Sequence, residues 1–395
     1  MKNLTDGHFT ENRGQRILRN RGRLIFGKGQ IVMKRKLLAT TALVACGMLV
    51  AISSASAAEK LQAKVGGYME QWFGYTSQDT VASQDLDGFD QKSDAEVHFS
   101  GSTTLDNGVS IGINVQLEAN TSGDQIDESY LIIKGSFGEI NLGSENSALY
   151  KMHVAPPDLG IGLNSGDQSD WVSFDGVGGT TGLFRGPFGG TYVEAGRVND
   201  ANRLTYYSPM IEGVQFGASY IPNGTEDSNA LVDRSASGNL VDGYALALRY
   251  KRSFGPMALA ASGGYGTMDN GGNAAADPSA WAFGLTLAGG GFSGGISYAA
   301  ADDDTSVADM SGVMVSGAYR SGPWGVNLAY YEGQRDGGGT SLGATMKTVH
   351  LSGEYALGPG VTLKGTFGRT EVEDDSASGT DNSGTYIVTG LKVSF

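Results

Sequence analysis

Apolar and polar residues alternate strictly in several segments of the chain. The clearest is Val109–Glu118, which reads VSIGINVQLE: its odd-numbered positions are all apolar, and its even-numbered positions are polar or glycine. The same period of two recurs at 281–287, 313–319 and 324–330. Because successive side chains of a strand point to opposite faces, this pattern predicts β-strands with one apolar and one polar face.

The connections between such segments alternate in length. Long polar links, such as 77–92, 223–242, 269–279, 302–309, 336–343 and 374–383, lie between short turns. The short turns are Asp106-Asn107-Gly108, Ser136-Phe137-Gly138, Glu212-Gly213, Gly255-Pro256, Gly289–Gly291, Gly322-Pro323 and Gly358–Gly360. Seven short turns and eight long loops predict about 16 antiparallel strands, and an even number places both ends on the periplasmic side of a membrane.

No stretch of residues 58–395 has the roughly 20 consecutive apolar residues that a transmembrane helix needs. Alternating segments of about ten residues are instead typical of a membrane barrel, which leaves no strand edge in lipid. We therefore predict an all-β fold, a transmembrane antiparallel β-barrel of about 16 strands. A surface β-sandwich acting as an adhesin is the alternative, but it gives no reason for regularly alternating loop lengths.

The last segment, Ile387–Phe395, also alternates, and its odd-numbered positions share one face. A terminal aromatic residue on such a strand resembles the recognition signal of outer-membrane barrels, so Phe395 is the expected C-terminal assembly signal. Aromatic pairs at 72–73, 206–207 and 330–331 are expected near strand ends, where amphipathic rings favour the headgroup region.

The N-terminal residues read as a targeting segment. Residues 33–57 have a basic start, an apolar run and an Ala-Ser-Ala cleavage site at 55–57, which predicts a signal peptide. A membrane anchor and a lipoprotein cleaved before Cys46 are the alternatives. Residues 1–32 are interpreted as a mis-called N-terminal extension, or else an unusually long start of the signal. The barrel is expected over 58–395, in the outer membrane of a Gram-negative bacterium.

Composition changes this picture once those segments are removed. The full chain has a net charge of −14, 62 Gly and one Cys. Without residues 1–57 it keeps 18 basic and 40 acidic residues, for a net charge of about −22 and no thiol. This charge argues against nucleic-acid binding, and the missing thiol excludes disulfides and thiolate metal sites.

The segment Gly135–Gly143, GSFGEINLG, resembles the hairpin that precedes the long third loop of the general porins of Gram-negative bacteria. The resemblance extends over essentially all of 58–395. It implies that the long link 145–200 folds into the barrel as a constriction loop and that the protein is a homotrimer with aqueous channels. The basic residues that family members place on the wall opposite this loop are hard to locate in this sequence.

Strand parity predicts which charged side chains face the lumen. The expected pore-lining bases are Lys64, Arg203, Arg249, Lys364 and Lys392, and the expected lumenal acids are Glu70, Glu96, Glu118 and Glu354. Closure of the barrel would make neighbours of Lys64, Lys364 and Lys392, near the periplasmic strand ends. In the constriction loop the acidic candidates are Asp158, Asp167, Asp170 and Asp175. The aromatic residues expected to pack it against the wall, or else to form part of a solute track, are Trp171, Phe174, Phe184 and Phe188.

These features predict a porin for passive diffusion of small hydrophilic solutes and ions, with a cation preference because charge at the narrowest point sets selectivity. A substrate-specific channel of the same fold is the alternative. No enzyme activity is expected, because no nucleotide-binding motif occurs and His98, His153 and His350 lack a local catalytic arrangement. No cofactor is expected, although Ca²⁺ could bind the acidic runs 85–88 and 302–304. The expected partners are outer-membrane lipid, lipopolysaccharide and further copies of the chain, and not nucleic acid.

Overall fold

The computed structural model describes residues 60–79, 84–120, 125–164, 166–174, 183–226, 228–272, 277–302, 309–337, 343–374 and 381–395. The predicted extension, the signal peptide with Cys46, and Asp175 lie outside these residues. No helix in the described ranges is long and apolar enough to cross a membrane.

Sixteen strands make up almost all of the regular structure. The first eight are β1 (Gln62–Gln78), β2 (Gly88–Thr104), β3 (Ser110–Glu118), β4 (Glu128–Gly135), β5 (Gly138–Ser144), β6 (Asn202–Tyr207), β7 (Val214–Asn223) and β8 (Leu240–Phe254). The others are β9 (Met257–Asn270), β10 (Ser279–Gly289), β11 (Phe292–Asp302), β12 (Met310–Ser321), β13 (Trp324–Arg335), β14 (Ala344–Gly358), β15 (Val361–Asp374) and β16 (Asn382–Ser394).

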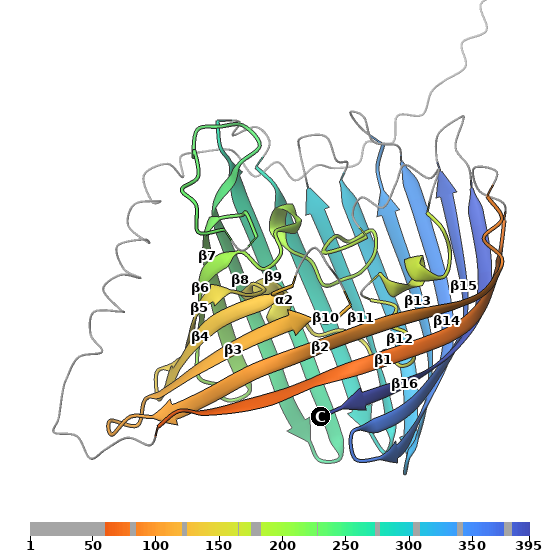
Figure 1. Ribbon diagram of the computed structural model, residues 1–395, viewed down its shortest axis with the longest axis horizontal. Helices are drawn as coiled ribbons and strands as arrows, with labels where there is room; N and C mark the ends of the chain where they lie inside the picture. Colours follow the sequence, from red (N-terminus) through yellow and green to blue (C-terminus); the bar gives the residue numbers. More distant parts are fainter. Residues whose placement is uncertain are drawn as a thin grey trace, which may run out of the picture. The chain divides into compact units, whose positions relative to one another are not determined.

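Each strand pairs antiparallel with its neighbours in the sequence, and β1 pairs with β16, so the sheet closes into a barrel (Figure 1). The predicted fold class is confirmed, and a sandwich with free edges is excluded. All seven predicted short turns join consecutive strands. The predicted link 77–92 was too long, because β1 extends to Gln78 and β2 begins at Gly88.

The two faces of each strand have the predicted difference in chemistry. In β13, Trp324, Val326 and Leu328 point outward and are exposed, while Asn327 and Ala329, at the alternate positions, point inward. Lipid would cover the outer apolar face. The expectation that aromatic pairs sit together at the interface was wrong in one respect. Two adjacent residues of a strand face opposite sides, so one member of each pair, such as Tyr331, is buried inside the barrel.

The chain's last residue completes the seam between β16 and β1. The backbone N–H of Phe395 donates to the carbonyl of Gly67, and the N–H of Gly67 donates to the carbonyl of Phe395, both at 3.1 Å. Gly67 has a φ of +145°, and a Cβ there would lie 2.2 Å from the carbonyl oxygen of Glu96. Only glycine fits this position, because a side chain would meet the backbone of β2.

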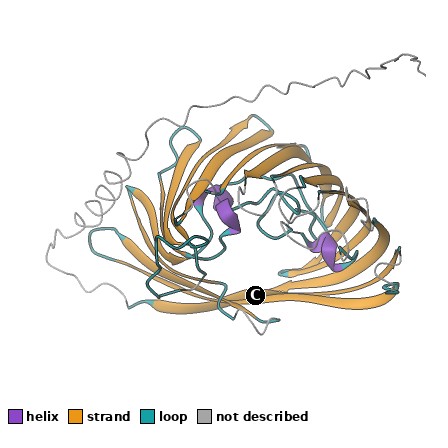
Figure 2. Ribbon diagram, turned by 90° about the horizontal axis from the view of Figure 1, so that it is seen from above, coloured by secondary structure: helices purple, strands orange, loops and turns teal. Residues whose placement is uncertain are grey.

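The described residues between β5 and β6 (145–164, 166–174 and 183–201) lie inside the ring of strands, with their short helices in the lumen (Figure 2). This segment, which we call the constriction loop, packs against the inner wall through four apolar clusters. Three of them join its Leu163, Phe174, Leu183 and Phe188 to β12–β15, its Leu149, Val193, Ala195 and Val198 to β7–β11, and its Ile161, Trp171 and Val172 to β1 and β16. The fourth joins its Ala148 and Met152 to β6 and β8. The loop and the wall therefore share hydrophobic clusters, as expected for a long third loop that folds into the barrel.

Glycines on the inner wall allow the loop to approach the strands closely. A Cβ on Gly284 of β10 would lie 1.6 Å from the carbonyl oxygen of Val154, and one on Gly312 of β12 would lie 2.2 Å from that of Pro187. The loop backbone thus rests directly on the backbone of the wall at these points. Part of the high glycine content follows from this contact.

Candidate functional site

A buried ionic cluster holds the constriction loop where it leaves β5. Lys151, at the end of the short helix α2 (Ala148–Lys151), has its Nζ 2.8 Å from Glu145 and 3.7 Å from Glu128. Burial raises the pKa of the Glu145 carboxyl. Burial alone would lower the pKa of Lys151, but the two carboxylates more than offset it and raise that pKa above its usual value. Loss of one partner would leave an uncompensated buried charge, so this end of the loop is firmly fixed.

A second cluster holds the loop where it returns to the wall. Arg203 of β6 has its Nη1 3.3 Å from Glu194, which also accepts a hydrogen bond from the backbone N–H of Ser147 at 2.7 Å. Burial, with the nearby Asp127 carboxylate, raises the pKa of Asp200 to about 8. Arg203 faces inward by parity, but its side chain is fully buried beneath the loop. It anchors the loop and does not line the aqueous passage.

Two adjoining cavities lie between the loop and the inner wall. The first, of about 420 Å³, we call the lysine-side cavity. Its wall carries Lys364 and Lys92, and its loop side carries three of the predicted acids. Its charged lining consists of Glu70, Lys92, Asp94 and Lys364 from the strands and Asp158, Asp167 and Asp170 from the loop. Loop acids and wall bases therefore meet across one passage.

Glu70 ties this cavity to the barrel seam. The Nζ of Lys364 is 3.4 Å from one oxygen of Glu70, and Lys392 pairs with the other. Each lysine also stands over an aromatic ring, Lys364 at 5.2 Å from Trp72 and Lys392 at 4.4 Å from Tyr68. Two lysines from different strands therefore share one carboxylate at the seam.

Asp158 shapes the loop at the edge of the lysine-side cavity. Its Oδ2 accepts hydrogen bonds from the backbone N–H groups of Leu163 at 2.6 Å and Asn164 at 3.1 Å. Burial raises its pKa to about 6, against the lowering effect of those two bonds and of Lys364. Burial also raises the pKa of Asp170. Part of the loop's negative charge is therefore sensitive to mild acid.

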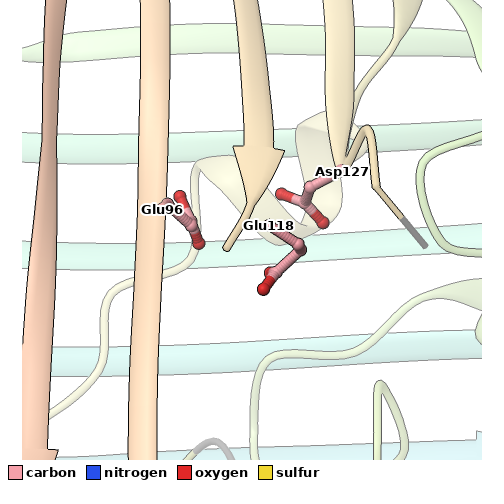
Figure 3. A group of neighbouring side chains, drawn as sticks. All are labelled: Glu96, Glu118 and Asp127. Carbon is pink, nitrogen blue, oxygen red and sulfur yellow. The ribbon is translucent and has the colours of Figure 1, made fainter. Parts of the chain in front are cut away.

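The second cavity, of about 950 Å³, we call the acid-wall cavity. The strands contribute Glu96 and Glu118, and Asp127 stands immediately before β4. Oxygens of these three carboxylates all lie within 4.8 Å of one another (Figure 3). The loop contributes Arg185, Arg197 and Asp167. The acids of the wall therefore face two bases and one acid of the loop across this cavity.

The other predicted lumenal residues lie away from the cavities. Lys64 is opposite Ser100 of β2 and beyond the end of β16, whose pairing with β1 starts at Tyr68, so the expected neighbourhood with Lys392 does not form. Arg249 donates to Gln215 at 2.6 Å. Glu354 accepts from Arg320 at 2.7 Å. The acidic run at 85–88 caps strand ends, since Asp87 accepts from the backbone N–H of Gln78 at 2.7 Å.

Three of the four loop aromatics pack in the apolar clusters as predicted: Trp171, Phe174 and Phe188. Phe184 does not, because its ring lines the acid-wall cavity and is 58% exposed. Sequence reasoning also missed Lys92, which it had placed in a link, and the loop bases Arg185 and Arg197, to which strand parity does not apply. Asp94 and Arg320 share the inward parity of their strands and could have been found.

A closed barrel with an apolar exterior and one long loop between charged inner cavities defines a transmembrane pore. A family model described as Gram-negative porin matches residues 39–375, and the chain belongs to that family. It is an outer-membrane β-barrel protein and a porin channel.

Solved structures agree on the fold. An anion-selective porin from Comamonas acidovorans shares 16% identity over 85% of this chain and 100% of its own, with a TM-score of 0.60. A trimer form of OmpT, an outer membrane protein of Vibrio cholerae, shares 14% identity over 85% and 100% of the two chains, with a TM-score of 0.56. A porin refined at 1.8 Å shares 17% over 85% and 100%, with a TM-score of 0.55. No curated protein sequence matches the chain.

Proposed function

We propose that this porin passes small hydrophilic solutes and ions passively, with a preference for cations. The observation that carries the preference is the charge around the two cavities. Nine acidic side chains line them in the described residues: Glu70, Asp94, Glu96, Glu118, Asp127, Asp158, Asp167, Asp170 and Glu226. Four basic ones do so: Lys92, Arg185, Arg197 and Lys364. Selectivity follows the sign of charge at the constriction, so cations are favoured.

The anion selectivity named for the Comamonas acidovorans porin does not argue against this preference. An identity of 16% shows a shared fold but not a shared set of pore-lining residues. The proposed channel needs no cofactor and performs no catalysis. The solute gradient drives transport, and the protein supplies a polar path through the apolar interior of the membrane.

The test is the reversal potential of purified protein in planar bilayers under a tenfold KCl gradient. A potential of the sign set by K⁺ supports the proposal, and one set by Cl⁻ overturns it. Swelling of proteoliposomes in small sugars, compared with large oligosaccharides, tests diffusion with a size limit. Rates that do not depend on solute size would contradict the constriction.

The proposal includes a homotrimer, supported by the outer face of β16, β1 and β2. Gln71 and Gln91 point outward there and are joined by a hydrogen bond of 2.9 Å, next to the outward Thr389. Amide side chains at this depth are costly against lipid but suit a protein partner. Heat-modifiable migration at trimer size in detergent gels is expected, and a monomer under mild extraction would contradict it.

The proposal also includes lipopolysaccharide as a partner at the outer rim. Lys347 and Arg369 stand on the strands above the outward apolar residues Val349 and Phe367, at the end of the barrel that carries the long loops. Cationic side chains there suit phosphate groups of the outer leaflet. Retention of lipopolysaccharide during purification should fall in K347Q/R369Q, and equal retention would refute this contact.

A further inference from the structure

The inner wall at the periplasmic end of the barrel carries charge opposite in sign to the lining of the two cavities. The short turns join the strands at this end (Figure 1). We call the inward side chains among the six residues of each strand nearest this end the periplasmic vestibule. Its bases are Lys64, Lys134, Arg249, Lys251, Arg320 and Lys392, and its acids are Glu139 and Glu354. Two further bases in this range are not counted, because Arg203 is buried beneath the loop and Lys364 lines the lysine-side cavity.

The acids of the vestibule balance only part of its positive charge. Glu139 lies 3.1 Å from the Nζ of Lys134, and Glu354 accepts a hydrogen bond from Arg320 at 2.7 Å. Both pairings join neighbouring strands on the inner face. Six bases against two acids leave a net charge of about +4 on these strands.

The short turns change this balance little. Glu212 lies 4.0 Å from Arg252, an outward base of β8, and Asp106 is the one other acid on the described short turns. Lys64 and Lys251 are exposed and form no ion pair with the described residues. The vestibule therefore presents a positive surface to the water of the lumen.

The acidic lining of the cavities lies farther from the periplasmic end. Glu70 is the ninth of the 17 residues of β1, and Glu96 is the ninth of the 17 residues of β2. Glu118 is the last residue of β3, at the end remote from its short turn. Nine acids and four bases line the two cavities. An ion that crosses the channel therefore meets an acidic zone and a basic zone in series.

Two zones of opposite charge in series respond differently to the two directions of voltage. The acidic zone attracts cations and repels anions, and the basic zone does the reverse. When the long-loop side is positive, cations enter through the acidic zone and anions enter through the basic zone, so both ions accumulate in the channel. With the opposite voltage each zone repels the ion that has to enter through it, and the channel is depleted of ions.

We infer that this porin conducts ions directionally, with the larger current when the long-loop side is positive. The inference rests on the proposed cation preference of the constriction and adds a direction to it, supplied by the periplasmic vestibule. Salt should control the effect. The screening length is about 10 Å at 0.1 M salt and about 3 Å at 1 M, so the two zones act across the lumen only in dilute salt.

The first test measures single-channel currents at equal voltages of both signs. We expect a current ratio of about twofold or more in dilute KCl, which corresponds to ~0.4 kcal/mol in ion occupancy, and a ratio near one in concentrated KCl. Orientation is marked with L231C, because Leu231 is 104% exposed in the loop between β7 and β8 and residues 58–395 contain no cysteine. After each recording, a polyethylene glycol maleimide too large to pass the channel is added to one chamber and then to the other. The chamber in which it changes the current is the long-loop side.

The second test changes the vestibule. K64E/K251E removes two positive charges and adds two negative ones, so the ratio should fall to near one. K251Q and R252Q form a matched pair, because these adjacent residues of β8 face opposite sides of the wall. K251Q should lower the ratio, and R252Q should leave it as in the native protein.

Each outcome supports or overturns the inference. If the currents are equal in dilute salt while the reversal potential keeps the sign set by K⁺, the inference fails and the proposed function stands. A reversal potential with the sign set by Cl⁻ means that the proposed function itself fails. A larger current with the long-loop side negative, or an unchanged ratio in K64E/K251E, overturns the inference. Should K64E/K251E not fold, the salt series on native protein decides, because asymmetry caused by the shape of the loop would persist in concentrated salt.

Discussion

Replacing Asp158 with asparagine should make the ion selectivity of the pore insensitive to mild acid. The Asp158 carboxyl has a pKa of about 6 because it is buried, against a usual value of 3.8. Holding it ionised in the folded protein therefore costs about 3 kcal/mol at neutral pH, taking ~1.4 kcal/mol per pKa unit. Asparagine keeps an oxygen that can accept from the backbone N–H groups of Leu163 and Asn164 but carries no charge to desolvate.

The direction of the pH effect follows from that raised pKa. Below the usual pKa the group is protonated in both folded and unfolded chains and imposes no cost. Between about pH 4 and pH 6 the cost grows, and above pH 6 it is complete, so this group makes the protein less stable as the pH rises. At the same time, ionised Asp158 adds one negative charge beside the passage. Cation preference should therefore fall, with a midpoint near pH 6, as the pH is lowered.

The assay combines two measurements on native protein and D158N. Reversal potentials in planar bilayers are recorded from pH 7.5 to pH 5, and heat denaturation of the detergent-solubilised barrel is followed over the same range. D158N should lack the selectivity change near pH 6 and denature at a higher temperature than native protein at pH 7.5. D170N is the control, because it removes a loop charge in the same cavity but keeps Asp158, and so keeps the change. Identical pH dependence in native protein and D158N would refute the reasoning.

Three further changes test other parts of the structure. E70Q should raise Cl⁻ permeability, because it leaves the two lysines that share this carboxylate without their counter-charge; an unchanged reversal potential would contradict the pairing. G312V should displace the loop from the wall at Pro187, at a cost of about 1–3 kcal/mol, and alter single-channel conductance, whereas unaltered conductance would mean that the loop is not seated there. Replacing Phe395 with serine should keep its backbone bonds to Gly67 but slow assembly, measured as heat-modifiable trimer in membranes over time; normal assembly would show that the aromatic ring is not a signal.

Most of the fold could be predicted from strand parity and from the residue types in the turns. Each of the seven turns was visible because glycine, proline or asparagine interrupts an alternating segment. A closed sheet followed because lipid offers no partner for a free strand edge. The same parity placed Glu70, Lys364 and Lys392 on the inner face, and the pairing of β1 with β16 then brought them together.

The site was less accessible to such reasoning, for two physical reasons. Lys92 lies in a strand whose first residues, apart from Phe89, are polar or glycine on both faces, so the strand resembles a loop in the sequence. Arg185 and Arg197 belong to a loop without periodicity, where the position of a side chain depends on tertiary packing. Arg203 shows the converse: parity gave its direction correctly, but only the structure shows that the loop buries it.

The way the constriction loop is held has a consequence for the order in which the protein acquires its shape. Ile161 donates its backbone N–H to Thr366, 205 residues further along the chain, and Pro187 accepts from Tyr331, 144 residues further along. The loop is therefore synthesised well before the wall on which it rests, and contacts of such long range form late. Until the last strands join the barrel, the wall residues that hold the loop are not in place. The permeability of the barrel is therefore set by the last step of assembly. Mutations in β12–β16 should then change leakiness to large solutes even where they never touch the passage.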